Sequence, residues 1–382
     1  MKKISILGST GSIGCQTLDV ISRRGGYTVT ALAAGRSVRL AEEQARAFKP
    51  ALFCLYDEAA AADLKVRISD LPTRVVSGKE GLLEAAAGVP ADMVSVSILG
   101  MIGLEPTIAA IRAGRDLAIA NKETLVTAGH LIMPLAKECG IRLLPVDSEH
   151  GAIFQCLEGE DRARVTKLFL TASGGPFRGK TREELKEIRP ADALKHPNWS
   201  MGAKITIDSS TLVNKGLEVM EAHWLYNMPY DQIRVVVHPQ SIVHSMVEFS
   251  DGSVKAQLAV PDMELPIAYA LYYPERTEAL CDRLDFWELP DLHFEKPDFE
   301  NFPGLSLAYE AGRAGGTMPT VYNAANEWAV QHFLAGTLSY PGIIEVIEKA
   351  MRAHTPAPDP SLEEVLAAEQ WVKNFLAPAG LS

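Results

Sequence analysis

KISILGSTGSIGCQTLDVISRRGGYTVTALAA, residues 3–34, contains the elements that decide the fold of the first part of the chain. Residues 3–7 form a short apolar run typical of a buried strand, and residues 8–14 hold three glycines. Residues 15–23 continue as a helix, and residues 27–34 predict the next strand. A strand, a turn, a helix and a second strand in this order predict a parallel sheet with a right-handed crossover.

The same alternation continues toward residue 146. A helix is predicted at about residues 38–48. Further strands are predicted at residues 51–55, 74–76, 92–98, 116–120 and 141–146. Helical stretches separate these strands, so we expect residues 1–146 to form an N-terminal Rossmann-like domain with a doubly wound parallel sheet, an α/β fold.

The pattern changes in the second part of the chain. Strands are predicted at residues 165–172, 203–208, 233–238, 242–249 and 253–260, and Ser250-Asp251-Gly252 is a hairpin turn between the last two. Strands this close together favour a mixed sheet, so we expect a central α+β catalytic domain at residues 147–272. A connector rich in Pro, Asp and aromatic residues is expected at 273–303, and a C-terminal helical bundle at 304–382.

Composition limits the classes of function. The chain has 382 residues and a formal net charge of −11, which argues against generic binding to nucleic acid or to an anionic membrane. Its five cysteines are scattered, with neither metal-ligand spacing nor a disulfide framework, and this predicts a reducing cytoplasm. No apolar run approaches the length of a transmembrane helix.

The glycine turn has the features of a nucleotide site. Gly8 permits a tight turn, Gly11 lets a pyrophosphate approach the backbone, and Gly14 lets the helix lie close to the sheet. The N-terminus of the helix would present free N–H groups to the phosphates. The spacing is G-x-x-G-x-x-G and not the commoner G-x-G-x-x-G, and a plain glycine turn is the alternative; the flanking strand and helix favour dinucleotide binding.

The residues at the end of the second strand indicate whether a site of this kind prefers NAD or NADP. A carboxylate there would bind a free ribose 2′-hydroxyl, but the strand ends in Ala34-Gly35-Arg36-Ser37. Arg36 can pair with a 2′-phosphate through its fork of donors, and the alternative is a solvated surface arginine. Asn121-Lys122-Glu123 follows a later strand, where it would either contact a ligand or begin a helix capped by Asn121.

Two segments offer carboxylates for a metal ion. Asp147 and Glu149 follow the strand at 141–146 and would point to the same side of an extended chain, although Asp147 could instead cap a helix. Glu218 is the candidate third ligand, and Glu221 one turn later could support it. An all-carboxylate set suits Mg²⁺ or Mn²⁺ better than zinc.

Hydroxyl and amide groups near Glu218 predict an anion site. Ser209 and Ser210 follow the predicted strand at 203–208, and Ser173 follows the strand at 165–172. A strand, a hydroxyl-rich turn and a helix start make a phosphate cradle, for which Lys215 would supply the charge. Asn214 and Lys215 share a helical face with Glu218; the alternative is a solvated Lys–Glu pair.

The segment HPNWSMG at 196–202 is predicted to be a mobile loop that closes over a ligand and excludes water. Its alternative is an ordinary loop anchored by a buried tryptophan.

Several long motifs together resemble the 1-deoxy-D-xylulose 5-phosphate reductoisomerase family. In chain order they are GSTGSIG (8–14), NKE (121–123), LPVDSEH (144–150), TASGGPF (171–177), HPNWSMG and NKGLE (within 196–218), HPQSIVHSMVEF (238–249) and YNAANEWAV (322–330). The resemblance runs in order through the whole chain. It implies an NADPH- and divalent-metal-dependent rearrangement and reduction of 1-deoxy-D-xylulose 5-phosphate to 2-C-methyl-D-erythritol 4-phosphate, in the methylerythritol phosphate route to isoprenoids. It also implies a homodimer.

The resemblance further implies a role for each matching residue. Contacts to NADPH are implied for Thr10, Gly11, Ser12, Ile13, Gly35, Arg36, Ser37, Asn121, Glu123 and Gly202. The cation, Mg²⁺ or Mn²⁺ with Co²⁺ as a further candidate, would be held by Asp147, Glu149 and Glu218. The sugar phosphate would contact Lys122, Ser148, Glu149, Ser173, His196, Ser209, Asn214, Lys215 and Glu218. Trp199 and Met201 would lie on a flap, and the implied catalytic group comprises Lys122, Asp147, Glu149, His196 and Glu218.

Two departures from the family pattern stand out. Ser37 occupies a position where many relatives have Asn, and Met263-Glu264-Leu265 replaces the Met-Arg-Thr of some relatives near the expected nicotinamide pocket. Two rival functions are weaker. A semialdehyde dehydrogenase needs a cysteine nucleophile with a histidine base, and neither Cys139 nor Cys156 has an obvious partner. An NADP-sensing scaffold would not need the three carboxylates.

Overall fold

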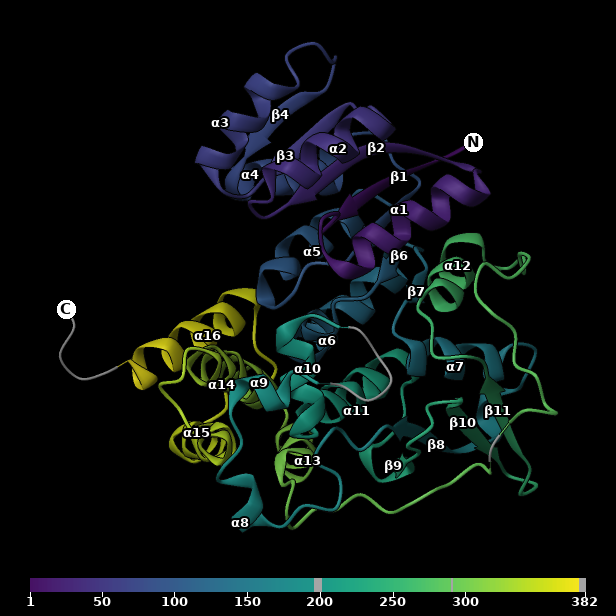
Figure 1. Ribbon diagram of the computed structural model, residues 1–382, viewed down its shortest axis with the longest axis vertical. Coiled ribbons are helices and arrows are strands. Elements are labelled where there is room, and N and C mark those ends of the chain that lie inside the picture. Colours follow the sequence, from purple (N-terminus) through teal and green to yellow (C-terminus); the bar gives the residue numbers. More distant parts are fainter. Residues whose placement is uncertain (196–200, 290, 378–382) are drawn as a thin grey trace. The chain divides into compact units, whose positions relative to one another are not determined.

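The computed structural model describes residues 1–195, 201–289 and 291–377 (Figure 1). The chain forms two compact units. Unit 1 consists of Met1–Thr124, Ile132–Gly151 and Asp262–Asp282. Unit 2 consists of Leu125–Leu131, Ala152–Pro261 and Arg283–Ser382. The later segment at 262–282 thus belongs to the same unit as the N-terminus.

Unit 1 is built on a parallel sheet of seven strands in the order β4-β3-β2-β1-β5-β6-β7. The strands are β1 (Lys2–Leu7), β2 (Tyr27–Ala34), β3 (Leu52–Leu55), β4 (Arg74–Ser77), β5 (Met93–Val96), β6 (Asp116–Ile119) and β7 (Leu143–Pro145). Because the strands are parallel, their carboxyl ends share one edge, and the strand order reverses between β1 and β5. The predicted doubly wound sheet is confirmed.

Helices follow most of these strands, as the alternating sequence pattern predicts. They are α1 (Ser12–Arg24), α2 (Val38–Phe48), α3 (Glu58–Arg67), α4 (Gly78–Leu83) and α5 (Leu104–Arg112). The chain passes between the two units within α6 (Lys122–Glu138) and α7 (Ser148–Leu157). Ile4, Ile6 and Leu7 of β1 are completely buried, as expected for a central parallel strand covered on both faces.

Helix α12 (Glu264–Tyr272) contacts α1 in unit 1. The rings of Tyr27 and Tyr272 meet edge to face with centroids 5.6 Å apart, and the Tyr272 hydroxyl donates to the Gly25 carbonyl at 2.6 Å. Glu264 forms an ion pair with Arg23 of α1. The departure from the family pattern at Glu264 therefore coincides with a link between α1 and α12.

Unit 2 contains a mixed sheet of four strands in the order β11-β10-β8-β9. The strands are β8 (Val165–Ala172), β9 (Ile233–Val237), β10 (Val243–Phe249) and β11 (Val254–Leu258). Only the β8–β9 pair is parallel. The helices wholly within this unit are α8 (Arg182–Leu185), α9 (Pro190–Ala193), α10 (Ala203–Ser210), α11 (Val213–Tyr226), α13 (Gly304–Ala314), α14 (Met318–Leu334), α15 (Tyr340–Ala353) and α16 (Leu362–Leu376).

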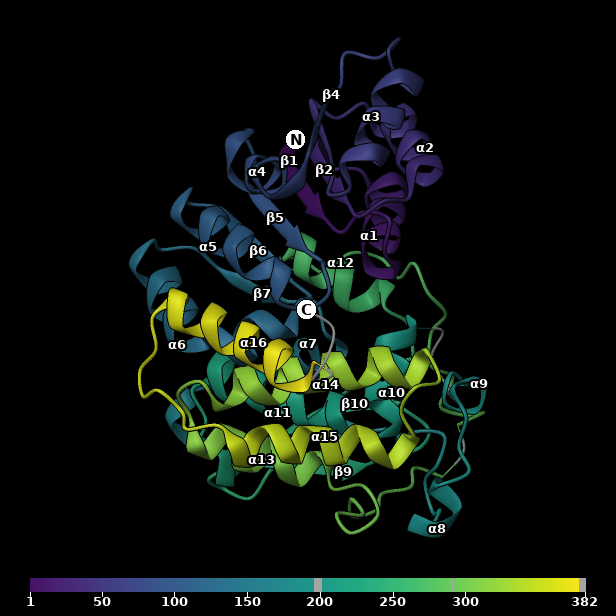
Figure 2. The same cartoon turned by 90° about the vertical axis from the view of Figure 1, so that its left-hand side faces the viewer.

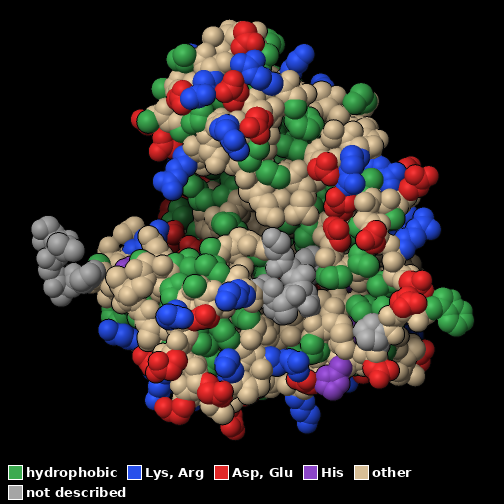
Figure 3. All heavy atoms as spheres, in the orientation of Figure 1, with side chains coloured by type: hydrophobic (Ala, Val, Ile, Leu, Met, Phe, Trp, Pro, Cys, Tyr) green, Lys and Arg blue, Asp and Glu red, His purple; other side chains and the backbone are tan. Residues whose placement is uncertain are grey.

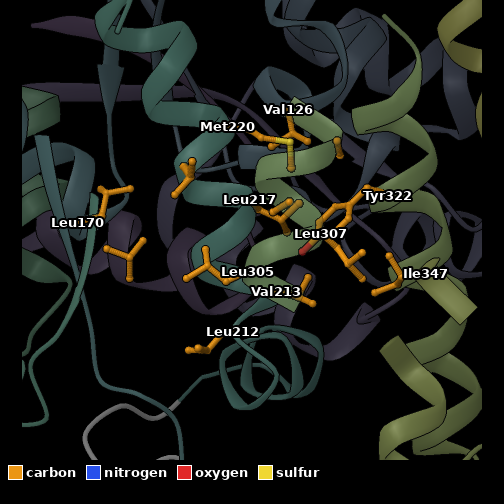
Figure 4. Packing of buried hydrophobic residues seen from close by; sticks show 14 of the residues in the cluster. Val126, Leu170, Leu212, Val213, Leu217, Met220, Leu305, Leu307, Tyr322 and Ile347 are labelled. Carbon is orange, nitrogen blue, oxygen red and sulfur yellow. The ribbon is translucent and has the colours of Figure 1, made fainter. Parts of the chain in front are cut away.

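One hydrophobic cluster joins the sheet and the helices of unit 2. Leu170 of β8, Leu217 of α11 and Leu305 of α13 belong to it, together with Tyr322 of α14 and Ile347 of α15 (Figure 4). Helices α14 and α15 lie side by side in Figure 2. The mixed sheet and the C-terminal helices therefore share a single core.

The predicted strand at 203–208 is wrong, because these residues form most of helix α10. Ile205, Thr206 and Ile207 are β-branched and favour a strand. In the structure, however, the Thr206 hydroxyl donates to the Gly202 carbonyl one turn earlier at 2.8 Å. Lys204 pairs with Asp208 at 2.8 Å, also one turn apart. Contacts at helical spacing and burial of Ile207 outweigh the local preference.

Acidic and basic side chains are intermixed on the face of the molecule shown in Figure 3. Within the part of the chain that the structure describes, no helix has the length and apolar character needed to cross a membrane.

Candidate active site

The turn after β1 requires glycine at two positions for steric reasons. Gly8 has a φ of +92°, and a Cβ there would lie 2.4 Å from the Ser97 carbonyl oxygen. A Cβ on Gly14 would lie 2.2 Å from the Gly8 carbonyl oxygen, so α1 approaches the turn more closely than any side chain permits. Gly11 and Ser12 are exposed where α1 begins, and the Gly11 N–H donates to the Gly8 carbonyl at 3.0 Å within the turn.

Other predicted cofactor residues follow strands at the same edge of this sheet. Gly35, Arg36 and Ser37 are exposed directly after β2. Asn121 is buried after β6 and caps α6, since its side-chain oxygen accepts a hydrogen bond from the Thr124 N–H at 3.0 Å. The capping role that the sequence left as an alternative for Asn121 is therefore present.

The acidic residues of unit 1 come at the end of β7. The segment is not extended as predicted, because α7 begins at Ser148 and places Glu149 in its first turn. The Asp147 carbonyl accepts a hydrogen bond from the Gly151 N–H at 2.7 Å, as at the start of a helix. The Ser148 hydroxyl donates to the Glu149 carboxylate at 2.5 Å. The backbone is therefore helical and not extended, but carboxylate oxygens of Asp147 and Glu149 still lie within 4.8 Å of each other.

Asp147 carries a negative charge in a nearly dry environment. Its carboxylate lies 2.6 Å from the Lys122 ammonium, and the two side chains are 13% and 8% exposed. Burial raises the pKa of Asp147, but the charge of Lys122, with smaller contributions from His150 and from hydrogen bonds, outweighs it and holds the pKa well below the ordinary value. The carboxylate is thus ready to ligate a cation. His150, fully buried, was not singled out from the sequence.

Glu218 of unit 2 lies in a matching environment. Asn214 donates to one carboxylate oxygen at 2.6 Å, and Lys215 contacts the other. Lys215 is only 4% exposed and Glu218 only 1%. The alternative of a solvated Lys–Glu pair is therefore wrong, because both side chains are buried. A buried charge pair of this kind is costly and is commonly retained for function.

The predicted phosphate residues also belong to unit 2. The loop after β8 has two glycines with positive φ, and a Cβ on Gly175 would lie 2.9 Å from the Ser209 carbonyl oxygen. This close approach brings the Ser173 loop against the end of α10. The Ser210 hydroxyl donates to the Ile207 carbonyl at 2.7 Å, whereas the Ser209 hydroxyl makes no hydrogen bond to any described residue. Ser209 is thus the hydroxyl available to a ligand.

Part of the predicted flap lies outside the residues that the structure describes. His196 and Trp199 lie outside the described residues, so their predicted roles remain predictions. Met201 and Gly202 are described, and Gly202 is the N-cap of α10.

The cysteines do not support the rival dehydrogenase function. Burial raises the pKa of Cys156 to about 11, which opposes formation of a thiolate nucleophile. Cys139 is exposed.

The fold and the turn define a class of protein. A doubly wound parallel sheet with a glycine turn at the point where its strand order reverses is the arrangement of Rossmann-like dinucleotide-binding proteins. The buried lysine–carboxylate pairs are additional to what that class requires.

Comparisons with known proteins then identify the family. Models of the 1-deoxy-D-xylulose 5-phosphate reductoisomerase family match residues 4–129, and models of its C-terminal domains match residues 143–226 and 258–375. The chain belongs to this family. The reductoisomerase of Lachnospira eligens is 56% identical over 376 residues, covering 98% of this chain and 99% of that protein. That of Halalkalibacterium halodurans is 53% identical over 380 residues, covering 98% and 99%.

Solved structures agree with this assignment. The reductoisomerase of Zymomonas mobilis in complex with NADPH is 42% identical and aligns with a TM-score of 0.91, covering 98% of this chain and 97% of that one. A reductoisomerase in complex with NADPH, fosmidomycin and magnesium is 40% identical, with a TM-score of 0.94 and the same coverage. The resemblance found in the sequence motifs is confirmed.

Proposed function

We propose that this chain converts 1-deoxy-D-xylulose 5-phosphate to 2-C-methyl-D-erythritol 4-phosphate, with NADPH and a divalent cation, in the methylerythritol phosphate route to isoprenoid precursors. The observation that carries the proposal is the match to the family over 98% of the chain. The glycine turn, the three carboxylates and the proposed phosphate cradle are the parts that such a reaction needs. Relatives in solved complexes hold NADPH and magnesium.

The cofactor would lie at the carboxyl edge of the seven-stranded sheet. Backbone groups of residues 10–13 would face the pyrophosphate, because α1 begins there. Arg36 and Ser37, after β2, would contact the 2′-phosphate that distinguishes NADPH from NADH. Gly35, Asn121, Glu123 and Gly202 complete the proposed contacts. NADPH supplies a hydride, and the protein orients its nicotinamide.

The cation would be held by Asp147, Glu149 and Glu218. All three are carboxylates, the oxygen ligands that Mg²⁺ prefers, with Mn²⁺ or Co²⁺ as further candidates. The low pKa of Asp147 means that protons do not compete for its oxygens near neutral pH. When bound, such a cation polarises the substrate carbonyl and stabilises negative charge on oxygen.

The two lysines have a place in this scheme. Lys122 lies against the Asp147 carboxylate and Lys215 against that of Glu218, so each buried carboxylate has a cationic neighbour. Cation binding would supply the balancing charge and leave the ammonium groups to bind the substrate. In the proposed site, Lys215 turns to the phosphate, and Lys122 to the reacting end of the sugar.

Hydroxyl and amide groups would hold the substrate. Ser173, Ser209 and Asn214 would bind the phosphate oxygens, and Ser148 would bind a sugar hydroxyl beside the metal ligands. The available hydroxyl of Ser209, next to a loop packed against its backbone, supports this assignment. The phosphate supplies binding energy remote from the reacting atoms, which the enzyme can use to orient them.

A homodimer in the cytoplasm is part of the proposal. Phe286 and Trp287 are 71% and 95% exposed in the connector, and β11 lies at the edge of its sheet. Exposed aromatic side chains of this kind commonly pack against a partner, here a second copy of this chain. The five free cysteines support a reducing compartment. Light scattering should give the mass of a dimer, and Trp287→Ser should shift it toward the monomer; a wild-type monomer would refute the dimer.

The activity is tested with purified full-length protein after removal of metal by a chelator. NADPH oxidation with 1-deoxy-D-xylulose 5-phosphate should vanish on chelation and return on addition of Mg²⁺ or Mn²⁺. The product should be 2-C-methyl-D-erythritol 4-phosphate by mass and chromatography. Tight NADPH binding without turnover in any divalent cation would refute the proposed function.

A further inference from the structure

The motif YNAANEWAV at 322–330 is not used by any ligand set described above. It lies in α14, and three of its polar residues, Tyr322, Asn323 and Asn326, are completely buried. The Asn326 side-chain amide donates to the Asp208 carboxylate at 2.8 Å, joining positions 118 residues apart. Asp208 belongs to α10 and directly precedes Ser209. The motif therefore touches the segment that carries the proposed phosphate ligand.

The Asp208 side chain is only 2% exposed, and each of its two carboxylate oxygens has a polar partner. One accepts from Asn326, and the other lies 2.8 Å from the Lys204 ammonium within α10. A buried carboxylate held in this way has a fixed orientation, because moving it would leave a charge without its hydrogen bonds. Asn326 thus fixes α10 relative to α14 by a directional contact.

Other contacts complete the fixation of the same helix end. The Tyr340 hydroxyl of α15 donates to the Ser210 carbonyl at 2.7 Å. The Gly175 loop packs so closely on the Ser209 backbone that a Cβ would come within 2.9 Å of its carbonyl oxygen. Two C-terminal helices and one loop therefore hold the backbone around Ser209.

We propose that Asn326, acting through Asp208, is a positioning residue for the sugar-phosphate site, because it sets where α10 presents the Ser209 hydroxyl. This inference rests on the proposed role of Ser209 in phosphate binding. Asn326 itself touches no ligand in this scheme. Its contribution is the placement of a hydroxyl whose hydrogen bond is sensitive to displacements below one ångström.

Asn323 provides a matched control in the same helix. It is as buried as Asn326, but its amide donates at 3.0 Å to Glu327 of α14 itself and not to α10. Replacing either residue by leucine removes one buried amide from α14. Only the Asn326 change removes the contact with α10, so a shared loss of stability can be separated from a loss of positioning.

The experiment measures kcat, both KM values and the melting temperature of full-length variants with NADPH and Mg²⁺. Asn326→Leu should raise the KM for 1-deoxy-D-xylulose 5-phosphate about tenfold or more and leave the KM for NADPH unchanged. Asn323→Leu should lower the melting temperature by about as much as Asn326→Leu does, with little change in either KM.

Equal kinetics for the two leucine variants, or equal rises in both KM values for Asn326→Leu, would overturn the inference. If Asn326→Leu fails to fold, Tyr340→Phe gives a second test, because its ring stays packed against Phe177 while its hydrogen bond to Ser210 is lost. It should raise the KM for the sugar phosphate by a smaller factor, and no rise would count against the inference.

Ser209→Ala separates this inference from the proposed function. An unchanged KM for the sugar phosphate in Ser209→Ala would refute the proposed phosphate role and remove the basis of the positioning role. A raised KM in Ser209→Ala with an unchanged KM in Asn326→Leu would refute the positioning role alone.

Discussion

The glycine turn of unit 1 and the α10–α11 segment of unit 2 are built in opposite ways. The turn depends on backbone geometry, and its exposed residues need no partner elsewhere in the chain. The α10–α11 segment depends on buried side chains such as Glu218 and Asp208, each of which needs a balancing cation and hydrogen bonds. A backbone site is thus specified locally, whereas a buried charged site is specified by the whole unit around it.

The largest expected effect is on the charged site. Glu218→Gln keeps the shape of the side chain but removes the charge that would hold the cation. Turnover should fall about a thousandfold or more, since cation stabilisation of developing charge contributes several kcal/mol. The NADPH dissociation constant should not change, because the glycine turn does not use Glu218. Steady-state kinetics and NADPH fluorescence check both parts, and full activity would remove Glu218 from the metal site.

The backbone site should respond to an added methyl group. In Gly14→Ala the new Cβ would overlap the Gly8 carbonyl oxygen, 2.2 Å away. We expect a loss of about 3 kcal/mol in the free energy of unfolding and NADPH binding at least about tenfold weaker. Denaturant titration and NADPH titration measure these changes.

Gly151→Ala, inside helix α7, is the control. Its Cβ would make an ordinary 3.5 Å contact with Pro266 of α12. Its stability should be unchanged or higher by up to about 1 kcal/mol. Equal losses in the two glycine variants would contradict the steric explanation.

A smaller effect is expected at the exposed part of the nucleotide site. Arg36→Ala should weaken NADPH binding about 10- to 100-fold and leave NADH binding nearly unchanged, because only the 2′-phosphate would lose its charged partner. Dissociation constants for the two cofactors provide the measurement. Arg39, which is exposed three residues later, provides a matched control as Arg39→Ala. Parallel losses for NADPH and NADH would show that Arg36 does not read the phosphate.

The smallest effect is a difference in reactivity between the cysteine thiols of the protein. It does not involve the catalytic activity. Burial raises the pKa of Cys156 to about 11, so only about one thiol in a thousand is ionised at pH 8. Cys139 is exposed, and Cys15 beside the glycine turn is half-buried with its pKa raised by burial. Labelling followed by mass spectrometry should therefore modify Cys139 first, Cys15 next and Cys156 later than either. Early labelling of Cys156 would show that unit 2 is less tightly packed around this residue than its 4% exposure indicates.

The sequence predicted the nucleotide turn well because a steric rule limits it to glycine. Gly14 is required by a contact inside a stretch of seven residues, and Gly8 by its positive φ, although the atom that a Cβ on Gly8 would meet belongs to the distant Ser97; the flanking strand and helix are also local. The order of strands around that turn followed from the alternation of strands and helices.

The charged site was predicted less completely, because burial is a tertiary property. The spacing of Lys215 and Glu218 placed them on one helical face, but it could not separate a solvated pair from a buried one. Residues 203–208 were predicted to be a strand from Ile205, Thr206 and Ile207, but contacts at helical spacing and the burial of Ile207 outweigh that preference. Asn326 lies 118 residues from Asp208, a separation that no local pattern reveals.

The return of α12 to unit 1 has a consequence for synthesis on the ribosome. Tyr27 of β2 donates a hydrogen bond to the Leu271 carbonyl, and Arg23 of α1 pairs with Glu264, so these two contacts form only after residue 271 has been made. Although domains tend to fold as they emerge, unit 1 is complete only after more than a hundred residues of unit 2 have been made. The cofactor-binding half of this protein is thus the first part translated but not the first part that can be completed.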